Sequence, residues 1–279
     1  MRRTALLLLS ALSVGPGWAA CPEPAAVEAA TESSRQELAS ALLDCLSEAD
    51  PARRDKLGFD TLSDWLRKDK LTLATRQRLL QGLLLQLDGP DNGWSHSFSL
   101  LTLSEIARTD RLQPWLDKTQ RENLLTLATE RLRGWRDYRG FDEATGWRHG
   151  VAHGADLLLQ LALNPALDAA AETRILDALA TQVLADGRHA YQFGEGGRLA
   201  RTALFALSRS DWTSERWDAY LQALAHPIVK ARDFDAPTLA RLHNLREFLL
   251  PMYFGLQEGK PAMRERYLPG LSKLLKRLP

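Results

Sequence analysis

GWRHGVAHGADLLL, residues 146–159, is the stretch of this sequence that best indicates its fold, because apolar residues at helical spacing accompany a line of polar ones. His149, His153 and Asp156 stand at offsets of 0, 4 and 7 residues. At about 100° per residue, these offsets fall within an arc of roughly 60° on one side of a helix. Leu157 and Leu158 add apolar surface of the kind that a helix buries. We therefore predict a packed helix whose polar line is a candidate ligand-binding face.

The same helical spacing of apolar residues extends over most of the chain, and hardly any segment alternates apolar and polar residues as a strand does. The sequence therefore predicts an all-α protein with about ten helices. Turn-forming pairs such as Asn164-Pro165 and Asp186-Gly187 mark helix boundaries. Helices are expected to begin near Ser33, Leu73, Ser95, Thr119, Gly146, Ala170, Gly196, Ser214, Ala236 and Pro261.

These helices fall into pairs. The first helices of the pairs recur every 45 residues or so, a period typical of HEAT- or armadillo-like arrays, roughly 40–47 residues. The second helix of a pair is more apolar than the first, as 147–163 is compared with 119–133, so second helices are expected to line a concave inner wall. The predicted fold is a helical-repeat α-solenoid or α/α superhelix, with a closed α/α toroid as the alternative. A single domain is expected over residues 21–279.

Residues 1–20 have the pattern of an export signal. Arg2 and Arg3 precede an apolar run from Ala5 to Val14, and small residues follow at Ala19 and Ala20. No run is long enough for a transmembrane span of about 20 residues. Loss of Arg2 and Arg3 reduces 36 basic residues to 34, against 35 acidic ones. This near-neutral charge argues against a nucleic-acid partner.

The two cysteines, Cys21 and Cys45, lie near the N-terminus of the expected mature chain. Export to an oxidising compartment favours a disulfide between them. The alternative is lipidation of Cys21, since Ala19-Ala20-Cys21 resembles the end of a bacterial lipobox. The mature protein is therefore expected to be periplasmic or extracellular, and a lipoprotein only under this alternative.

A loop with polar or aromatic residues precedes each of three predicted second helices: DNGWSH from Asp91, YRGFDE from Tyr138 and GEGGR from Gly194. Stacked repeats bring such loops to one rim, where unpaired N–H groups at helix N-termini favour anionic ligands. A turn or capping role is the alternative for Asp91, Ser95 and Asp142. The candidate ligand-binding residues are His149, His153, Asp156, Asp91, His96, Trp147, Glu195 and Arg198.

His149 and His153 are also candidate ligands for a divalent metal such as zinc, because histidines four residues apart on a helix can chelate one ion. Gly150 stands where zinc proteases carry a glutamate, and Asp156 lies about 10 Å along the helix axis from His149. A third ligand is therefore expected from Asp91, His96 or Glu195. The alternatives are hydrogen-bonded structural histidines and a site for a ligand other than a metal.

Carboxylates near the rim provide a second chemical hypothesis. Four of them could supply an acid and a base for glycan cleavage, with three aromatic rings as platforms for the sugar. The carboxylates are Asp91, Asp142, Glu143 and Glu195, and the rings are Trp94, Phe141 and Trp147.

Four segments carry a family resemblance: DNGWSHSFSLLTL from Asp91, RGFDEATGWRHGVAHGADLLLQLA from Arg139, FGEGGRLARTALFAL from Phe193 and NLREFLLPMYFGL from Asn244. Their most specific part is Trp-x-His-x-x-x-His-x-x-Asp, which ends at Asp156. Together they resemble the bacterial family known as domain of unknown function 2785. This chain has His96 where the family pattern has an arginine. The resemblance implies a helical-repeat fold over residues 73–256 and brings no established activity.

We therefore expect an exported helical-repeat protein that binds a ligand, a peptide or a protein partner around His149, His153 and Asp156. The alternative function is a metal- or carboxylate-dependent hydrolase that acts on an envelope glycan or peptide.

Overall fold

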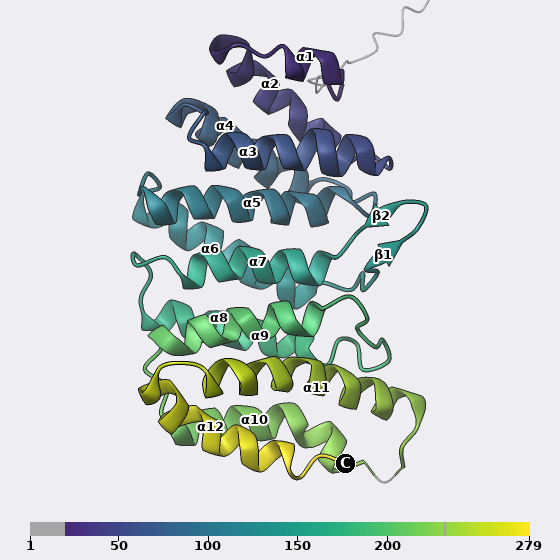
Figure 1. Cartoon of the computed structure of the whole chain (residues 1–279), viewed down its shortest axis with the longest axis vertical. Coiled ribbons are helices and arrows are strands. Elements are labelled where there is room, and N and C mark those ends of the chain that lie inside the picture. The colour runs from purple at the N-terminus through teal and green to yellow at the C-terminus, as the bar shows by residue number, and fades with distance from the viewer. Residues whose placement is uncertain (1–19, 232) are drawn as a thin grey trace, which may run out of the picture.

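The computed structural model describes residues 20–231 and 233–279 (Figure 1). Within these residues the chain forms α-helices, one π-helix (η1) and one two-stranded antiparallel sheet. The order is α1 (Pro24–Glu28), α2 (Glu32–Cys45), η1 (Ala52–Asp60), α3 (Thr61–Arg67), α4 (Leu73–Asp88), α5 (Ser95–Leu112), α6 (Lys118–Gly134), β1 (Phe141–Asp142), β2 (Gly146–Trp147), α7 (Gly150–Ala162), α8 (Ala169–Val183), α9 (Glu195–Arg209), α10 (Ser214–Val229), α11 (Ala236–Gln257) and α12 (Pro261–Leu275). The predicted all-α class is confirmed.

The helices stack along the long axis of the molecule (Figure 1). Helices α5, α7, α9 and α11 lie side by side, each in contact with the next, and α6, α8 and α10 lie behind them. Each front helix also packs against the helix that precedes it in the chain, as α4 does with α5 and α6 with α7. Helices α1 and α12 lie at opposite ends, so the stack is open.

The helix starts follow from local signals. Helices α4, α6, α8, α10 and α12 begin within one residue of the predicted first-helix positions. Side-chain oxygens of Thr72, Asp117, Asp168 and Thr213 accept backbone N–H groups at the starts of four of them, which satisfies donors that a helix leaves unpaired. Of the front helices, α7 is buried over nearly its whole length.

One predicted helix begins later than expected, and this shift places the candidate site. Helix α7 starts at Gly150, whereas the sequence predicted Gly146. Gly146 has a φ of 72° and His149 a φ of 51°, and left-handed residues interrupt a right-handed helix. Gly146 and Trp147 instead form β2, which pairs with Asp142 and Phe141 of β1. His149 is therefore the residue before α7 and not part of its first turn.

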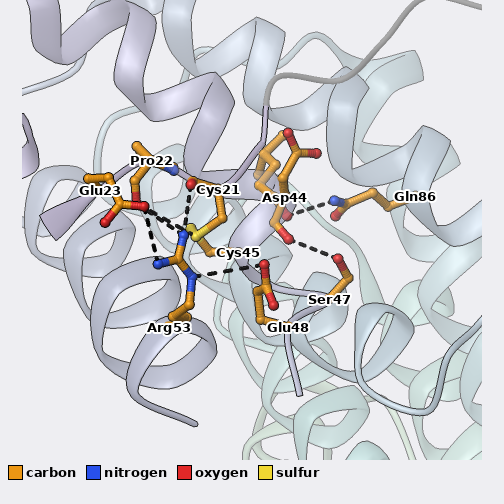
Figure 2. The surroundings of a disulfide bond; sticks show 10 residues. Cys21, Pro22, Glu23, Asp44, Cys45, Ser47, Glu48, Arg53 and Gln86 are labelled. Carbon is orange, nitrogen blue, oxygen red and sulfur yellow. Dashed lines mark hydrogen bonds and ion pairs between the residues drawn. A yellow bond between two sulfur atoms is a disulfide. The ribbon is translucent and has the colours of Figure 1, made fainter. Parts of the chain in front are cut away.

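The N-terminal segment is held by a disulfide, shown in Figure 2. Cys21 and Cys45 are both buried, and their sulfurs are bonded, which confirms the predicted bond. Arg53 lies beside it and donates a hydrogen bond of 2.8 Å to the carbonyl oxygen of Cys21. Lipidation of Cys21 would require the sulfur that this bond uses, so the structure favours the disulfide over that alternative. The expected export signal lies outside the described residues, apart from Ala20.

Arg54 connects this segment to the hairpin. The sequence did not predict η1 or α3, which fill the interval between Cys45 and α4. The Arg54 side chain on η1 is fully buried and donates to the carbonyl oxygens of Glu48, Ala49 and Thr145 at 3.1, 3.1 and 2.9 Å. A Cβ atom on Gly146 would lie 3.1 Å from Arg54 Nη2, so a residue without a side chain allows this approach.

Among the helices of the described residues, none is both long enough and apolar enough to cross a membrane.

Candidate functional site

Three exposed aromatic side chains gather at one rim of the stack. Phe141 and Trp147 are cross-strand partners in the hairpin, with ring centroids 4.9 Å apart. Phe193, in the loop before α9, lies 6.5 Å from Phe141 and 5.9 Å from Trp147. The three residues remain 43%, 38% and 38% exposed. Exposed apolar side chains that gather rather than scatter mark interaction sites, and we call these three residues the aromatic platform.

A buried polar pair supports the platform from the interior. The His149 ring stacks on Trp147, with centroids 4.8 Å apart and planes inclined by 24°. His149 Nε2 lies 3.5 Å from Glu195 Oε1. The other oxygen of Glu195 accepts a 3.0 Å hydrogen bond from the backbone N–H of Phe193. The pair therefore contacts two of the three platform residues.

The polar pair also holds a buried charge. Burial alone would raise the pKa of Glu195, but His149 and backbone N–H groups outweigh it and hold the pKa below its ordinary value. Glu195 is therefore ionised at neutral pH. His149 Nε2 faces Glu195 Oε1 at 3.5 Å and makes no closer polar contact in the described part of the chain, and the backbone of His149 is left-handed. Strained backbone gathers at functional sites, so His149 remains a candidate site residue.

His153 lies one helical turn further along and has a different environment. Its Nδ1 faces Ser97 Oγ at 2.8 Å and the Ser97 carbonyl oxygen at 3.2 Å. A carbonyl oxygen only accepts, so Nδ1 carries the proton. Burial, followed by the charge of His149, lowers the pKa of His153 to about 3. His153 is therefore neutral at physiological pH and joins α7 to α5.

These contacts predict the behaviour of His153→Ala. The substitution removes a buried ring that hydrogen-bonds Ser97 and packs edge-on against Phe98, so it should lower the free energy of unfolding by about 1 to 3 kcal/mol at pH 7. Urea unfolding followed by circular dichroism measures this change. A change below about 0.5 kcal/mol, the range of ordinary surface substitutions, would contradict it.

The lowered pKa of His153 also predicts acid sensitivity. The unfolded side chain binds a proton below its ordinary pKa of about 6.5, whereas the folded one binds it only near pH 3. The contribution of His153 to stability is therefore complete above pH 6.5 and is lost as the pH falls. The loss is about 2 kcal/mol between pH 6.5 and 5. In His153→Asn, which keeps a donor but does not titrate, stability should fall less steeply in that interval; equal slopes for the two proteins would refute the expectation.

The rest of the predicted polar line pairs with neighbouring helices. Asp156 Oδ2 forms an ion pair with Nη1 of Arg198 on α9. Gln160 Oε1 accepts a hydrogen bond of 3.1 Å from Arg111 on α5. Burial raises the pKa of Asp156, although Arg198 opposes the shift. These contacts join adjacent front helices, and Arg198 stays half-exposed.

Asp91 and His96 lie in a neighbouring cavity of ≈ 430 Å³, lined also by Trp135 and Asp137. Asp91 Oδ1 accepts hydrogen bonds from Gly93 N, Ser95 Oγ and His96 N, which is the turn role given as its alternative. His96 Nε2 contacts the Gly89 carbonyl oxygen at 3.0 Å. In the described ranges, no group of three or more His, Cys, Asp or Glu side chains is arranged to hold a metal ion. Within those ranges, the predicted metal ligands His149 and His153 therefore lack a third ligand close to both of them.

A second cavity, of ≈ 510 Å³, adjoins the platform. Phe141 and Phe193 line it together with Arg139, Asp142, Arg148 and Gln192. Phe193, Arg139 and Arg148 were not among the predicted site residues. Phe193 could have been predicted, because it is an aromatic residue next to Gly194 in a polar loop. Trp94, predicted as a sugar platform, is instead covered by the Arg148 guanidinium, 4.1 Å from its ring centroid.

Comparison with known proteins gives a family. A family model described as "Protein of unknown function (DUF2785)" matches residues 79–254. No curated protein and no solved structure matches the chain significantly. The match covers the hairpin, the platform and the front helices from α5 to most of α11. The chain therefore belongs to the DUF2785 family, as the resemblance of its four segments predicted.

Proposed function

We propose that this chain is an exported ligand-binding protein whose binding site is the aromatic platform. The observation that carries the proposal is the support of three exposed rings by a buried polar pair. His149 stacks under Trp147, and Glu195 fixes the backbone of Phe193. A left-handed histidine and a buried charge both lower the stability of a fold. Here they hold exposed aromatic rings in one arrangement, and a purely structural role does not explain why.

The carboxylates at the rim favour binding over hydrolysis. A glycosidase needs a carboxylic acid with a raised pKa to protonate the leaving group. The pKa values of both Glu195 and Asp142 are lowered. Asp142 Oδ1 also accepts hydrogen bonds from Ala144 N, Thr145 N and Thr145 Oγ1 within the hairpin turn. The proposal of a carboxylate-dependent hydrolase therefore has less support.

The disulfide supports the proposed location. Bonds of this kind form and persist in oxidising compartments and are rare in the cytosol. The Cys21–Cys45 bond, together with the export signal expected over residues 1–20, supports a periplasmic or extracellular protein.

A thermal-shift screen with defined compounds tests the function. The panel contains neutral sugars, short peptides, nucleotides and aromatic acids. We expect one class to raise the melting temperature of the wild type, because a ligand at 100 times its Kd stabilises the native state by about 2.7 kcal/mol. In Trp147→Ala that increase should disappear.

Phe205→Ala is the matched control, since Phe205 on α9 has the same 38% exposure as Trp147 and lies outside the platform. It should respond to the ligand as the wild type does. Stabilisation that persists in Trp147→Ala, or the absence of any stabilising class, would contradict the proposed function.

A further inference from the structure

We infer that the ligand of the aromatic platform is an uncharged saccharide, an inference that rests on the proposed function and names its ligand class. The cavity beside the platform supplies the first argument. Its volume of ≈ 510 Å³ falls within the range of small-ligand sites, about 300–1,000 Å³. Phe141 and Phe193 form apolar walls, and polar side chains occupy the remaining surface.

The charges around this cavity compensate one another. Arg139 binds Asp137 through two contacts, with Nε 2.8 Å from Oδ1 and Nη2 2.5 Å from Oδ2. Arg148 acts electrostatically on both Asp137 and Asp142. Each arginine here therefore lies near an aspartate. A strongly charged ligand that approached one of the two would be repelled by the other, and this repulsion weakens binding when the groups are desolvated. An uncharged ligand avoids this cost.

The polar groups also match hydroxyl chemistry. A hydroxyl group both donates and accepts hydrogen bonds. Arg139 and Arg148 have guanidinium N–H groups beyond those that donate to Asp137 and to the Gly93 carbonyl oxygen. Asp142 Oδ1 serves the hairpin turn, which leaves Oδ2 to accept, and Gln192 can do both. The electron-rich faces of Phe141 and Phe193 suit the C–H face of a sugar ring. A compound with an apolar face and a rim of hydroxyl groups satisfies both sets of residues.

A peptide fits this rim less well. Extended peptides commonly bind by adding a strand to an exposed sheet edge, where backbone hydrogen bonds provide affinity. The sheet here consists of two strands of two residues each, Phe141–Asp142 and Gly146–Trp147. Its edges are too short for such pairing, so side-chain recognition must dominate.

Isothermal titration calorimetry with defined oligosaccharides tests the inference. The panel holds neutral tetrasaccharides of glucose, N-acetylglucosamine, galactose and mannose, with tetragalacturonate as the anionic probe and tetraglucosamine as the cationic one. We expect a neutral tetrasaccharide to bind the wild type and Phe205→Ala equally. Trp147→Ala removes the ring that packs against both walls, Phe141 and Phe193, and should weaken binding at least about tenfold. Gln192→Ala, on an exposed loop, should weaken it about threefold with an unchanged melting temperature.

Three results would overturn the inference: no neutral tetrasaccharide binds, a charged one binds tenfold more tightly, or Trp147→Ala binds as well as the wild type. The thermal-shift panel separates this failure from failure of the proposed function. If peptides, nucleotides or aromatic acids give stabilisation that depends on Trp147, the site is retained and only the ligand class is wrong. If no class does, both proposals fail.

Discussion

Replacing Arg54 with alanine is expected to lower the free energy of unfolding by about 3 to 5 kcal/mol. The Arg54 side chain is completely buried and its Nε lies 2.7 Å from Asp55 Oδ1. Its removal leaves three carbonyl oxygens without their donor, those of Glu48, Ala49 and Thr145. The guanidinium also lies 4.8 Å from the ring centroid of Phe98, so the substitution opens a cavity in the core.

Arg53→Ala provides the control for this measurement, because Arg53 is the neighbouring residue and 29% of its side chain is exposed. Its ion pairs with Glu23 and Glu48 are long, at 3.6 and 3.9 Å, and partly exposed pairs contribute little, about 0–1 kcal/mol. Arg53→Ala also loses one hydrogen bond, to the Cys21 carbonyl oxygen. Chemical denaturation of the two variants should therefore separate them by at least about 1 kcal/mol. Equal stabilities would contradict the role assigned to Arg54.

The sequence predicts the helices better than their junctions. The starts of α4, α6, α8, α10 and α12 were predicted within one residue, and four of these five starts have a local side-chain cap, such as Asp117 or Asp168. The start of α7 was misplaced because the hairpin in front of it depends on a long-range contact. Arg54, 91 residues away from Thr145, packs against Gly146, and no local pattern reports that contact.

The candidate site was predicted in part. Trp147 and Glu195 were predicted from the loops before second helices, and His149 was predicted from the polar line of the expected helix. The structure brings these three together. His153 shares the same helix face in the sequence pattern, but its environment is set by Ser97 of α5. Helix periodicity predicts the direction in which a side chain points, but it does not predict which residues of the adjacent helix it contacts. Phe193 was missed for the same reason, since its partners lie on the hairpin.

Removing the disulfide with Cys21→Ala and Cys45→Ala together is expected to lower the free energy of unfolding by about 3 to 4 kcal/mol. The bond joins residues separated by 24 positions, and the loop-closure model gives about 3.5 kcal/mol for a loop of this length. Alanine is the suitable replacement because Cys45 is completely buried and a serine hydroxyl there would need a hydrogen-bond partner. A fall in melting temperature of roughly 10 °C is the corresponding thermal result.

Treatment of the wild type with a thiol reductant should produce the same loss, while the double variant should not respond to the reductant at all. The measurement also tests whether the N-terminal segment belongs to the same folding unit as the family-matched region at residues 79–254. Arg54 hydrogen-bonds across that boundary to Thr145, so we expect one cooperative transition for the oxidised wild type, seen equally by far-ultraviolet circular dichroism and by tryptophan fluorescence. Two separate transitions, only the first of them sensitive to the reductant, would contradict this. They would mean that the segment up to α3 unfolds alone and that the contact between Arg54 and the hairpin does not couple it to the platform.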